Sequence, residues 1–215
     1  LRHDDPMPAP PTGNPGPNGP FRPQPPLVVG LVGGIAAGKS KVAGLFGARG
    51  FLHVDADFHA KAVAEDPQAL AEVAAQLGDR FVQGGQLDRA ALGDHVFRVP
   101  EAKARLEAIM HPRVRQRITT ALDSARQRGD SALLDVPLLF EAGLFEICDT
   151  VVFVEASDEA RAERARSRGW ADDELIRREQ NQLPLADKRA RSQHIIDNNG
   201  DLSATEQAVD DLLLQ

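Results

Sequence analysis

Cysteine is almost absent from this sequence, since Cys148 stands alone among 215 residues. A disulfide framework is therefore excluded, and a reducing compartment is the natural interpretation. Long apolar runs are also missing, because no stretch approaches the ~20 residues that a membrane-spanning helix needs. The N-terminal segment lacks the apolar core of a signal peptide, so we expect a cytoplasmic protein without a membrane partner.

An excess of basic residues is lacking too. The formal net charge is −7 and the pI is near 5.4. Proteins that bind nucleic acid usually present a basic face, so nucleic acid is not an expected partner. Hydrophobic residues make up 42% and charged residues 27%, a balance typical of a globular domain with a sizeable core.

Branched aliphatic residues are scarce in residues 1–26, which hold ten of the 15 prolines. Such a segment cannot bury enough apolar surface to offset the entropy lost on ordering it. We predict a disordered or extended tail, with a proline-rich docking ligand as the alternative. The folded domain is expected over residues 27–215.

From residue 27 onward, short β-rich runs alternate with helical stretches, which is typical of an α/β fold with a parallel sheet covered by helices. The predicted strands are residues 27–32, 51–54, 131–136, 150–155 and 193–196. Residues 57–129 contain no convincing strand and show apolar residues at three- and four-residue spacing. We therefore predict a nucleotide-binding core interrupted by a helical substrate lobe and, further on, by a lid. The predicted parts are the core at 27–56, 130–156 and 192–215, the lobe at 57–129 and the lid at 157–191.

The most informative motif is GGIAAGKS at 33–40, between an apolar run and a stretch that can form a helix. It satisfies the nucleotide-phosphate loop pattern G-x-x-x-x-G-K-[ST]. A backbone wrapped around a phosphate turns its N–H groups inward, and the following helix directs its positive end at the same anion. The residues expected to bind the triphosphate are Gly33, Gly34, Ile35, Ala36, Ala37, Gly38, Lys39, Ser40 and Lys41. Within this loop we expect Lys39 against the β- and γ-phosphates and the Ser40 hydroxyl on Mg²⁺.

Three carboxylates follow predicted strands. Asp55 and Asp57 lie at the carboxyl end of the second strand, where ligands bind in an open parallel sheet. Either could accept the proton of an attacking hydroxyl or hold Mg²⁺, and either could instead cap the helix that begins near residue 58. Asp135 ends the third strand and resembles the acidic residue that supports Mg²⁺ through water in related nucleotide sites.

The remaining candidates are less distinctive. His111 precedes Pro112 inside helical sequence, where proline can open a helix and leave the histidine near its N-terminus. Glu141 follows the third strand and is a substrate-contact candidate, although a surface glutamate is the plain alternative. The predicted lid is rich in arginine, which favours solvated ion pairs for most of these residues and phosphoryl contact for one or two. These arginines are Arg161, Arg164, Arg166, Arg168, Arg177, Arg178, Arg189 and Arg191.

Taken together, the blocks GLVGGIAAGKS, VDAD, LDRAALGDHVF, IMHPRV, DVPLLFEAGL and IIDNNG closely resemble the dephospho-CoA kinase family. The resemblance covers essentially all of residues 27–215. It implies a P-loop kinase-like sheet with a helical CoA-binding lobe and an arginine-bearing lid. It also implies the transfer of phosphate from ATP to the ribose 3′-hydroxyl of dephospho-CoA, which is the last step of coenzyme A synthesis.

The resemblance also implies roles for individual residues. Asp57 matches the family's proposed base, and Arg164 matches the lid arginine that helps neutralise the transferring phosphoryl group and bind ATP. The expected metal ligands are Ser40 and, through water, Asp135. The residues expected on the acceptor side are Asp55, Asp57, Lys61, His111 and Glu141, with Gln182 and Lys188 at lid positions.

Three residues depart from the family pattern. Lys41 replaces a common threonine and can supply charge to a phosphate but not the same short hydrogen bond. Lys61 replaces a usual arginine and loses any bidentate grip on phosphate. Val32 replaces a threonine before the first loop glycine. None of these changes removes a group that the implied mechanism needs.

Two other functions fit the same motifs. A kinase for a nucleoside monophosphate or a similar acceptor would share the phosphate loop, and a panel of acceptors with ATP would identify it. An ATP-binding regulatory module would bind nucleotide tightly and turn over no acceptor. The presence of Asp57 and Arg164 beside the loop argues against the second alternative.

Overall fold

The computed structural model describes residues 25–171, 173–180 and 182–214. The predicted tail at 1–26 therefore lies outside the described residues, apart from its last two positions. In the described part of the chain, no helix combines the length and the apolar character that crossing a membrane would require.

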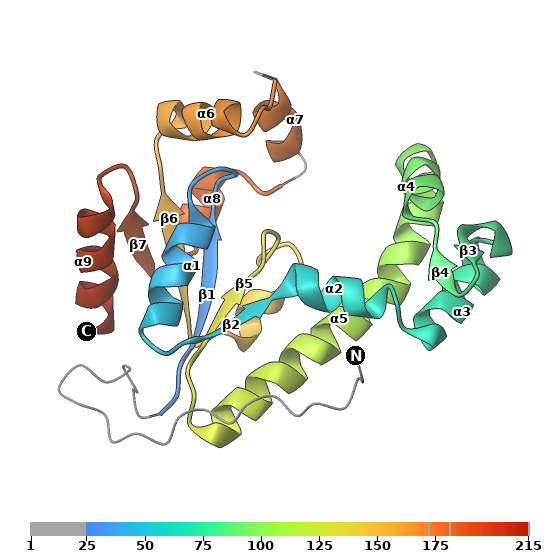
Figure 1. Ribbon diagram of the computed structural model, residues 1–215, viewed down its shortest axis with the longest axis horizontal. Coiled ribbons are helices and arrows are strands. Elements are labelled where there is room, and N and C mark those ends of the chain that lie inside the picture. The colour runs from blue at the N-terminus through green and yellow to red at the C-terminus, as the bar shows by residue number, and fades with distance from the viewer. Residues whose placement is uncertain (1–24, 172, 181, 215) are drawn as a thin grey trace, which may run out of the picture.

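Five parallel strands form the central sheet in the order β2-β5-β1-β6-β7 (Figure 1). Their bounds are β1 Val28–Gly33, β2 Leu52–Asp55, β5 Ala132–Asp135, β6 Thr150–Glu155 and β7 His194–Asp197. Each coincides with a predicted strand to within one residue at either end, so the predicted parallel sheet is confirmed. Because β1 occupies the centre, the loop that follows it emerges at the middle of the sheet's carboxyl edge, where ligands bind in this class of fold.

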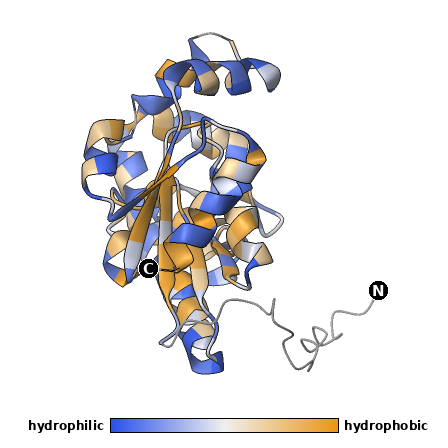
Figure 2. Cartoon of the chain, turned by 90° about the vertical axis from the view of Figure 1, so that its left-hand side faces the viewer, coloured by the Kyte–Doolittle hydropathy of each residue, from blue (hydrophilic) through white to orange (hydrophobic). Residues whose placement is uncertain are grey.

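Side chains of β1 alternate between two cores, as the pleat of a strand requires. Val28 and Val32 join the cluster that contains Ile118 and Leu122 of α5 (Pro100–Arg128). Val29 and Leu31 face the other cluster, which α1 (Lys39–Ala48) and α9 (Leu202–Leu213) cover. Figure 2 shows the apolar residues concentrated on the strands and polar residues on the outer surfaces of the helices. The three central strands, β1, β5 and β6, are therefore buried on both faces, whereas the edge strands β2 and β7 are largely exposed.

The segment 57–129 is built around α5, which packs against α2 (Ala56–Val63), α3 (Pro67–Leu77) and α4 (Arg89–Arg98). A small separate core holds it together through Val73, Phe81, Leu92 and Ile109. The prediction that this segment lacks strands is wrong. A hairpin of β3 (Val82–Gln83) and β4 (Gln86–Leu87) follows a 3₁₀ turn at Asp79–Phe81. Two-residue strands are too short to show alternation, and the turn signal was the Gly84-Gly85 pair, both at positive φ.

The prediction of a helix start at Pro112 is also wrong. α5 runs through Pro112 without a break, so His111 lies in the middle of the helix rather than near its N-terminus. An interior proline costs a helix about 3 kcal/mol. Burial of Ile109 before it and of Ile118 and Leu122 after it holds both halves of the helix in place and outweighs that cost.

Capping residues mark several helix starts as the sequence suggests. Asp66 accepts the backbone N–H groups of Gln68 and Ala69, and Pro67 opens α3 where a missing N–H is harmless. Asp88, Ser157 and Asp201 cap α4, α6 (Asp158–Ser167) and α9 in the same manner. Local sequence therefore fixes where these helices begin.

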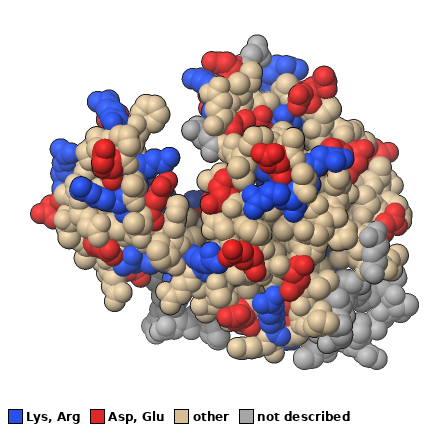
Figure 3. Space-filling view, turned by 180° about the vertical axis from the view of Figure 1, so that it is seen from behind, with Lys and Arg blue, Asp and Glu red and all other residues tan. Residues whose placement is uncertain are grey.

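The segment 157–191 contains α6 (Asp158–Ser167), α7 (Glu174–Glu179) and α8 (Leu185–Ala190), which lie over the carboxyl edge of the sheet (Figure 1). A further 3₁₀ turn, Leu144–Ile147, precedes β6. Seen from behind, the molecule is hollowed between the α3–α4 part of the lobe and the core with α6 and α7 above it (Figure 3). The assignment of these two segments as substrate lobe and lid stays a prediction.

Candidate active site

The phosphate loop joins the end of β1 to the start of α1. Gly38 caps this helix at φ 95°, a left-handed conformation that glycine adopts freely. No side chain caps the helix, so its first N–H groups are available to an anion. Ala36 also has a positive φ, 61°, which is unusual outside glycine and is typical of strained ligand-binding loops.

Asn198, just after β7, supports this loop from below. Its side chain is buried and donates from Nδ2 to the carbonyl of Ala37 at 2.7 Å. A Cβ added to Gly38 would lie 2.1 Å from the same nitrogen, so this side chain can occupy its place only because residue 38 is glycine. Lys41 and Thr205 donate to Asn198 Oδ1 at 3.3 and 3.1 Å. The sequence held the signal in the IDNNG block, but no role was predicted for Asn198.

Lys39 folds back over the loop, and its Nζ donates to the carbonyls of Gly33 and Gly34, both at 3.0 Å. Burial lowers the pKa of Lys39, although the nearby Asp135 acts in the opposite direction. Lys188, Arg161 and Arg168 add to the lowering. The Lys39 ammonium is therefore held against the loop carbonyls, and a negatively charged phosphate bound nearby would stabilise its charged form.

A cavity of about 280 Å³, which we call the phosphate cavity, lies beside the loop. It brings together Lys39, Ser40, Asp55, Asp57 and Asp135, which the sequence had marked from three separate segments. Arg168 at the end of α6 lines the same cavity, and so does His53 of β2. Arg168 was among the eight arginines of the predicted lid, but nothing in the sequence distinguished it from the others.

The two carboxylates at the junction of β2 and α2 differ in their structural roles. Asp55 caps α2, because its Oδ1 accepts the backbone N–H of Asp57 at 2.8 Å. The capping alternative is therefore realised for Asp55, while the side chain of Asp57 lies in the first turn of the helix. Asp135 lies 3.6 Å from His53 Nε2. Burial raises the pKa of Asp135, with a further contribution from Asp55, while Lys39 and His53 oppose the rise.

A larger cavity of about 860 Å³, which we call the apolar cavity, adjoins the phosphate cavity between α2, α5 and the segment after β5. Its lining is mainly apolar and includes Met110, Val114, Val136 and Leu138, with His111 at its side. Gln182, Arg115 and Arg178 supply polar groups. Asp57 and Pro137 line both cavities. Asp57 therefore lies where a group bound in one cavity would meet a group bound in the other.

Other predicted residues do not line either cavity. Arg164 contacts the phosphate loop from outside, donating to the carbonyls of Ala37 at 3.0 Å and Asn198 at 2.7 Å. Lys61 is exposed on α2. Glu141 accepts the N–H of Leu183 at 2.8 Å and pairs with the buried Lys188 at 3.1 Å. Partial burial alone would raise the pKa of Glu141, but these two donors lower it.

The segment 157–191 also contacts the loop through an ion pair. Arg161 is buried and pairs with Glu179 of α7 and with Asp158. Glu179 in turn accepts the N–H of Ile35 at 3.3 Å. This pair links α6 and α7 to the anion-binding loop, a contact that sequence spacing could not foresee.

Comparison with known proteins shows the family of this chain. The family model "Dephospho-CoA kinase" matches residues 27–204. This chain belongs to the dephospho-CoA kinase family. The dephospho-CoA kinase of Deinococcus radiodurans is 42% identical over 209 residues, which is 95% of this chain and 98% of that protein. The predicted family membership is thus confirmed.

Two solved structures share the fold of this chain. TT1252 from Thermus thermophilus superposes with a TM-score of 0.76 at 34% identity, covering 88% of this chain and 97% of that one. The dephospho-CoA kinase from Campylobacter jejuni superposes with a TM-score of 0.65 at 23% identity, over 87% and 95% of the two chains. At that identity the second likeness concerns the fold alone.

The phosphate cavity of this dephospho-CoA kinase family member also has the donors that Mg²⁺ prefers. The hydroxyl of Ser40 and the carboxylates of Asp55, Asp57 and Asp135 line it, and all are hard oxygen ligands. Within the described ranges, no group of three or more His, Cys, Asp or Glu residues could hold a metal by itself. These oxygen donors suit Mg²⁺, which commonly takes one or two protein ligands and completes its shell with water and substrate phosphate.

Proposed function

We propose that this protein transfers the γ-phosphoryl group of ATP to the ribose 3′-hydroxyl of dephospho-CoA, with the residues of the two adjoining cavities in the roles given below. Family membership supports the reaction. The single observation that carries the assignment of residues is the position of Asp57, in the wall common to the phosphate cavity and the apolar cavity.

The donor binds at the loop. The free N–H groups at the start of α1 and the ammonium of Lys39 receive the β- and γ-phosphates. Lys39 then exchanges its two carbonyl partners for phosphate oxygens, a stronger charge-assisted contact. The loop stays in shape during this exchange because Asn198 and Arg164 hold its carbonyls from the other side.

The acceptor binds in the apolar cavity, whose volume falls within the range of small-molecule sites, roughly 300–1,000 Å³. Its ribose would reach the phosphate cavity past Asp57. The Asp57 carboxylate orients the hydroxyl and receives its proton as the bond to the γ-phosphorus forms, while the bond from that phosphorus to the β–γ bridging oxygen breaks and ADP leaves. His111 lines the acceptor side of the same wall. Contacts of Lys61 and Glu141 with the acceptor stay predictions.

Charge that develops on the transferring group needs a cation. Arg168 is the lid arginine that already lines the phosphate cavity, so we assign it this role. The role that the resemblance implies for Arg164 stays a prediction, because its guanidinium would first have to leave the loop carbonyls. In its present position Arg164 positions the loop and so supports ATP binding.

Ser40, with Asp135 behind it, would hold Mg²⁺. When bound, the metal ion supplies positive charge to the β- and γ-phosphates. The cytoplasmic location that the single cysteine suggests also stays a prediction.

The test is to incubate the purified protein with Mg-ATP and dephospho-CoA and to identify the product by mass spectrometry. A gain of one phosphate at the ribose 3′-position supports the proposal. Equal or faster turnover of adenosine or a nucleoside monophosphate would refute the proposed acceptor.

A further inference from the structure

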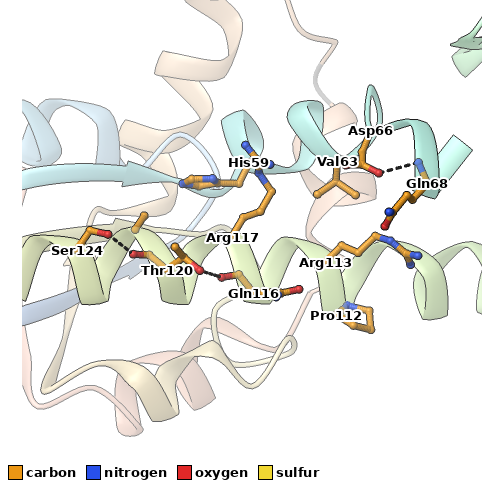
Figure 4. Close-up of a pocket in the computed structure, with 11 residues that line it drawn as sticks. His59, Val63, Asp66, Gln68, Pro112, Arg113, Gln116, Arg117, Thr120 and Ser124 are labelled. Atoms are coloured by element: carbon orange, nitrogen blue, oxygen red, sulfur yellow. Dashed lines mark hydrogen bonds between the residues drawn. The ribbon is translucent and has the colours of Figure 1, made fainter. Parts of the chain in front are cut away.

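A separate cavity of about 770 Å³ lies between α2, the start of α3 and the middle of α5 (Figure 4). It faces the side of α2 that carries His59 and Val63, whereas Ala56, Asp57 and Ala60 face the apolar cavity. The two cavities have only Pro112 in common, and this one has no residue in common with the phosphate cavity. The proposed reaction therefore makes no use of it.

Two arginines of α5 line this cavity, and only one of them is neutralised. Arg113 pairs with Glu72 at 2.6 Å and also donates to the carbonyl of Ile109 at 2.8 Å. Arg117 has no hydrogen-bond or ion-pair partner among the residues that the structure describes. Figure 4 shows its side chain extending from α5 toward α2 and ending beside His59. An unneutralised guanidinium in a concave site is a ready ligand for a phosphate.

His59 adds a second polar group at the same end. Its Nδ1 is buried and lacks a hydrogen-bond partner among the described residues. Burial and the nearby Arg117 lower the pKa of His59, against a weaker opposing effect of Asp55. A neutral imidazole carries its proton on one ring nitrogen, and a protonated Nδ1 could donate to an anion. An unsatisfied buried polar atom is unfavourable, and a ligand that accepts its hydrogen bond removes that cost.

The other polar groups of the wall suit hydroxyl groups on the ligand. Thr120 and Ser124 donate their own protons to the carbonyls of Gln116 and Thr120, so their hydroxyl oxygens remain able to accept. Asp66 lies at the opposite end, where its carboxylate caps α3. We therefore expect the phosphate of a ligand to bind at the Arg117 end of the cavity and its hydroxyl groups to bind along α5.

We propose that this cavity binds a small phosphorylated polyol or sugar, with its phosphate held between the Arg117 guanidinium and His59 Nδ1 and its hydroxyl groups donating to Thr120 and Ser124. The volume is within the range of small-molecule sites. The site is distinct from both substrate sites and does not depend on the proposed reaction.

The test uses glycerol 3-phosphate as the probe, with the phosphate loop filled beforehand by a non-hydrolysable ATP analogue. The ring signals of His59, assigned with a His59→Gln variant, are followed by NMR. We expect saturable shifts of these signals with glycerol 3-phosphate and none with glycerol, because only the phosphate can pair with the Arg117 guanidinium.

Arg117→Gln should weaken binding at least about tenfold, the effect of losing one charge-assisted contact. Arg128→Gln is the matched control, because it removes the same charge from an exposed position of α5 that pairs only with Asp130 in the described chain. Its affinity should equal that of the wild type. Unshifted His59 signals, an equal response to glycerol, or unchanged affinity in Arg117→Gln would each overturn the proposal.

Discussion

Asp55 and Asp135 are register partners across the parallel pair of β2 and β5. Partners in neighbouring parallel strands present their side chains on the same face of the sheet, so two carboxylates lie next to each other at its carboxyl edge. Asp55 contributes to the raised pKa of Asp135, and burial contributes most. The folded protein therefore disfavours the ionised form of Asp135, at the place where its chemistry is proposed.

Asp135→Asn should stabilise the protein at neutral pH while lowering activity. The pKa of Asp135 is higher in the folded state than the 3.8 of an ordinary aspartate, so ionisation favours the unfolded state. Stability from this group is present below about pH 4 and is lost as the pH rises through the folded pKa. The melting temperature of the variant should therefore exceed that of the wild type at pH 8, with a smaller difference near pH 4.5. Thermal melts across this range measure it, and a difference that is constant with pH would contradict this account.

Asp57→Asn should reduce phosphoryl transfer by about 10²–10⁴-fold, the usual contribution of a general base, and leave ATP binding nearly unchanged. Asp57 lines the cavity from the first turn of α2 and is not part of the loop that would hold the nucleotide. Steady-state kinetics and calorimetric ATP titration separate the two effects. Asp88→Asn is a suitable control, because asparagine also caps a helix and Asp88 lies at the start of α4. Full activity of Asp57→Asn would transfer the base role to Asp55 or to solvent.

Arg168→Gln and Arg164→Gln should give opposite kinetic patterns. Loss of Arg168, the cavity residue, should lower kcat by about 10²–10³-fold with little change in the KM for ATP. Loss of Arg164 should mainly raise the KM for ATP, because the loop loses its contacts to the Ala37 and Asn198 carbonyls. Arg166→Gln, on the exposed side of α6, is the matched control. If Arg164→Gln instead carries the large loss in kcat, Arg164 is the transition-state cation and the lid must rearrange during turnover.

The contrast between these two arginines shows what the sequence could and could not predict. Strands and the phosphate loop follow from local patterns, so five strands and the position of Lys39 were predictable. Arg164 and Arg168 are one helical turn apart, and their local sequence is equally arginine-rich. Which of them enters the cavity depends on how α6 crosses the loop, a tertiary packing angle. The continuity of α5 through Pro112 also depended on packing, because buried residues on both sides overrode a local signal.

Gly38→Ala tests whether the loop depends on its close contact with Asn198. A methyl group at residue 38 would lie 2.1 Å from Asn198 Nδ2, and the positive φ of 95° is itself unfavourable for alanine. The hydrogen bond from Asn198 to the Ala37 carbonyl should break, leaving a buried amide without its partner, which is unfavourable by about 1–3 kcal/mol. We expect a lower melting temperature and a loss of ATP affinity of at least tenfold. Gly44→Ala is the control, because a methyl group there meets no atom within 4 Å and alanine favours the helix.

Asn198→Ala in the Gly38→Ala background would relieve the steric conflict, so the double variant should lose less stability than the sum of the two single changes. Strict additivity in thermal and calorimetric measurements would show that the two residues do not act together.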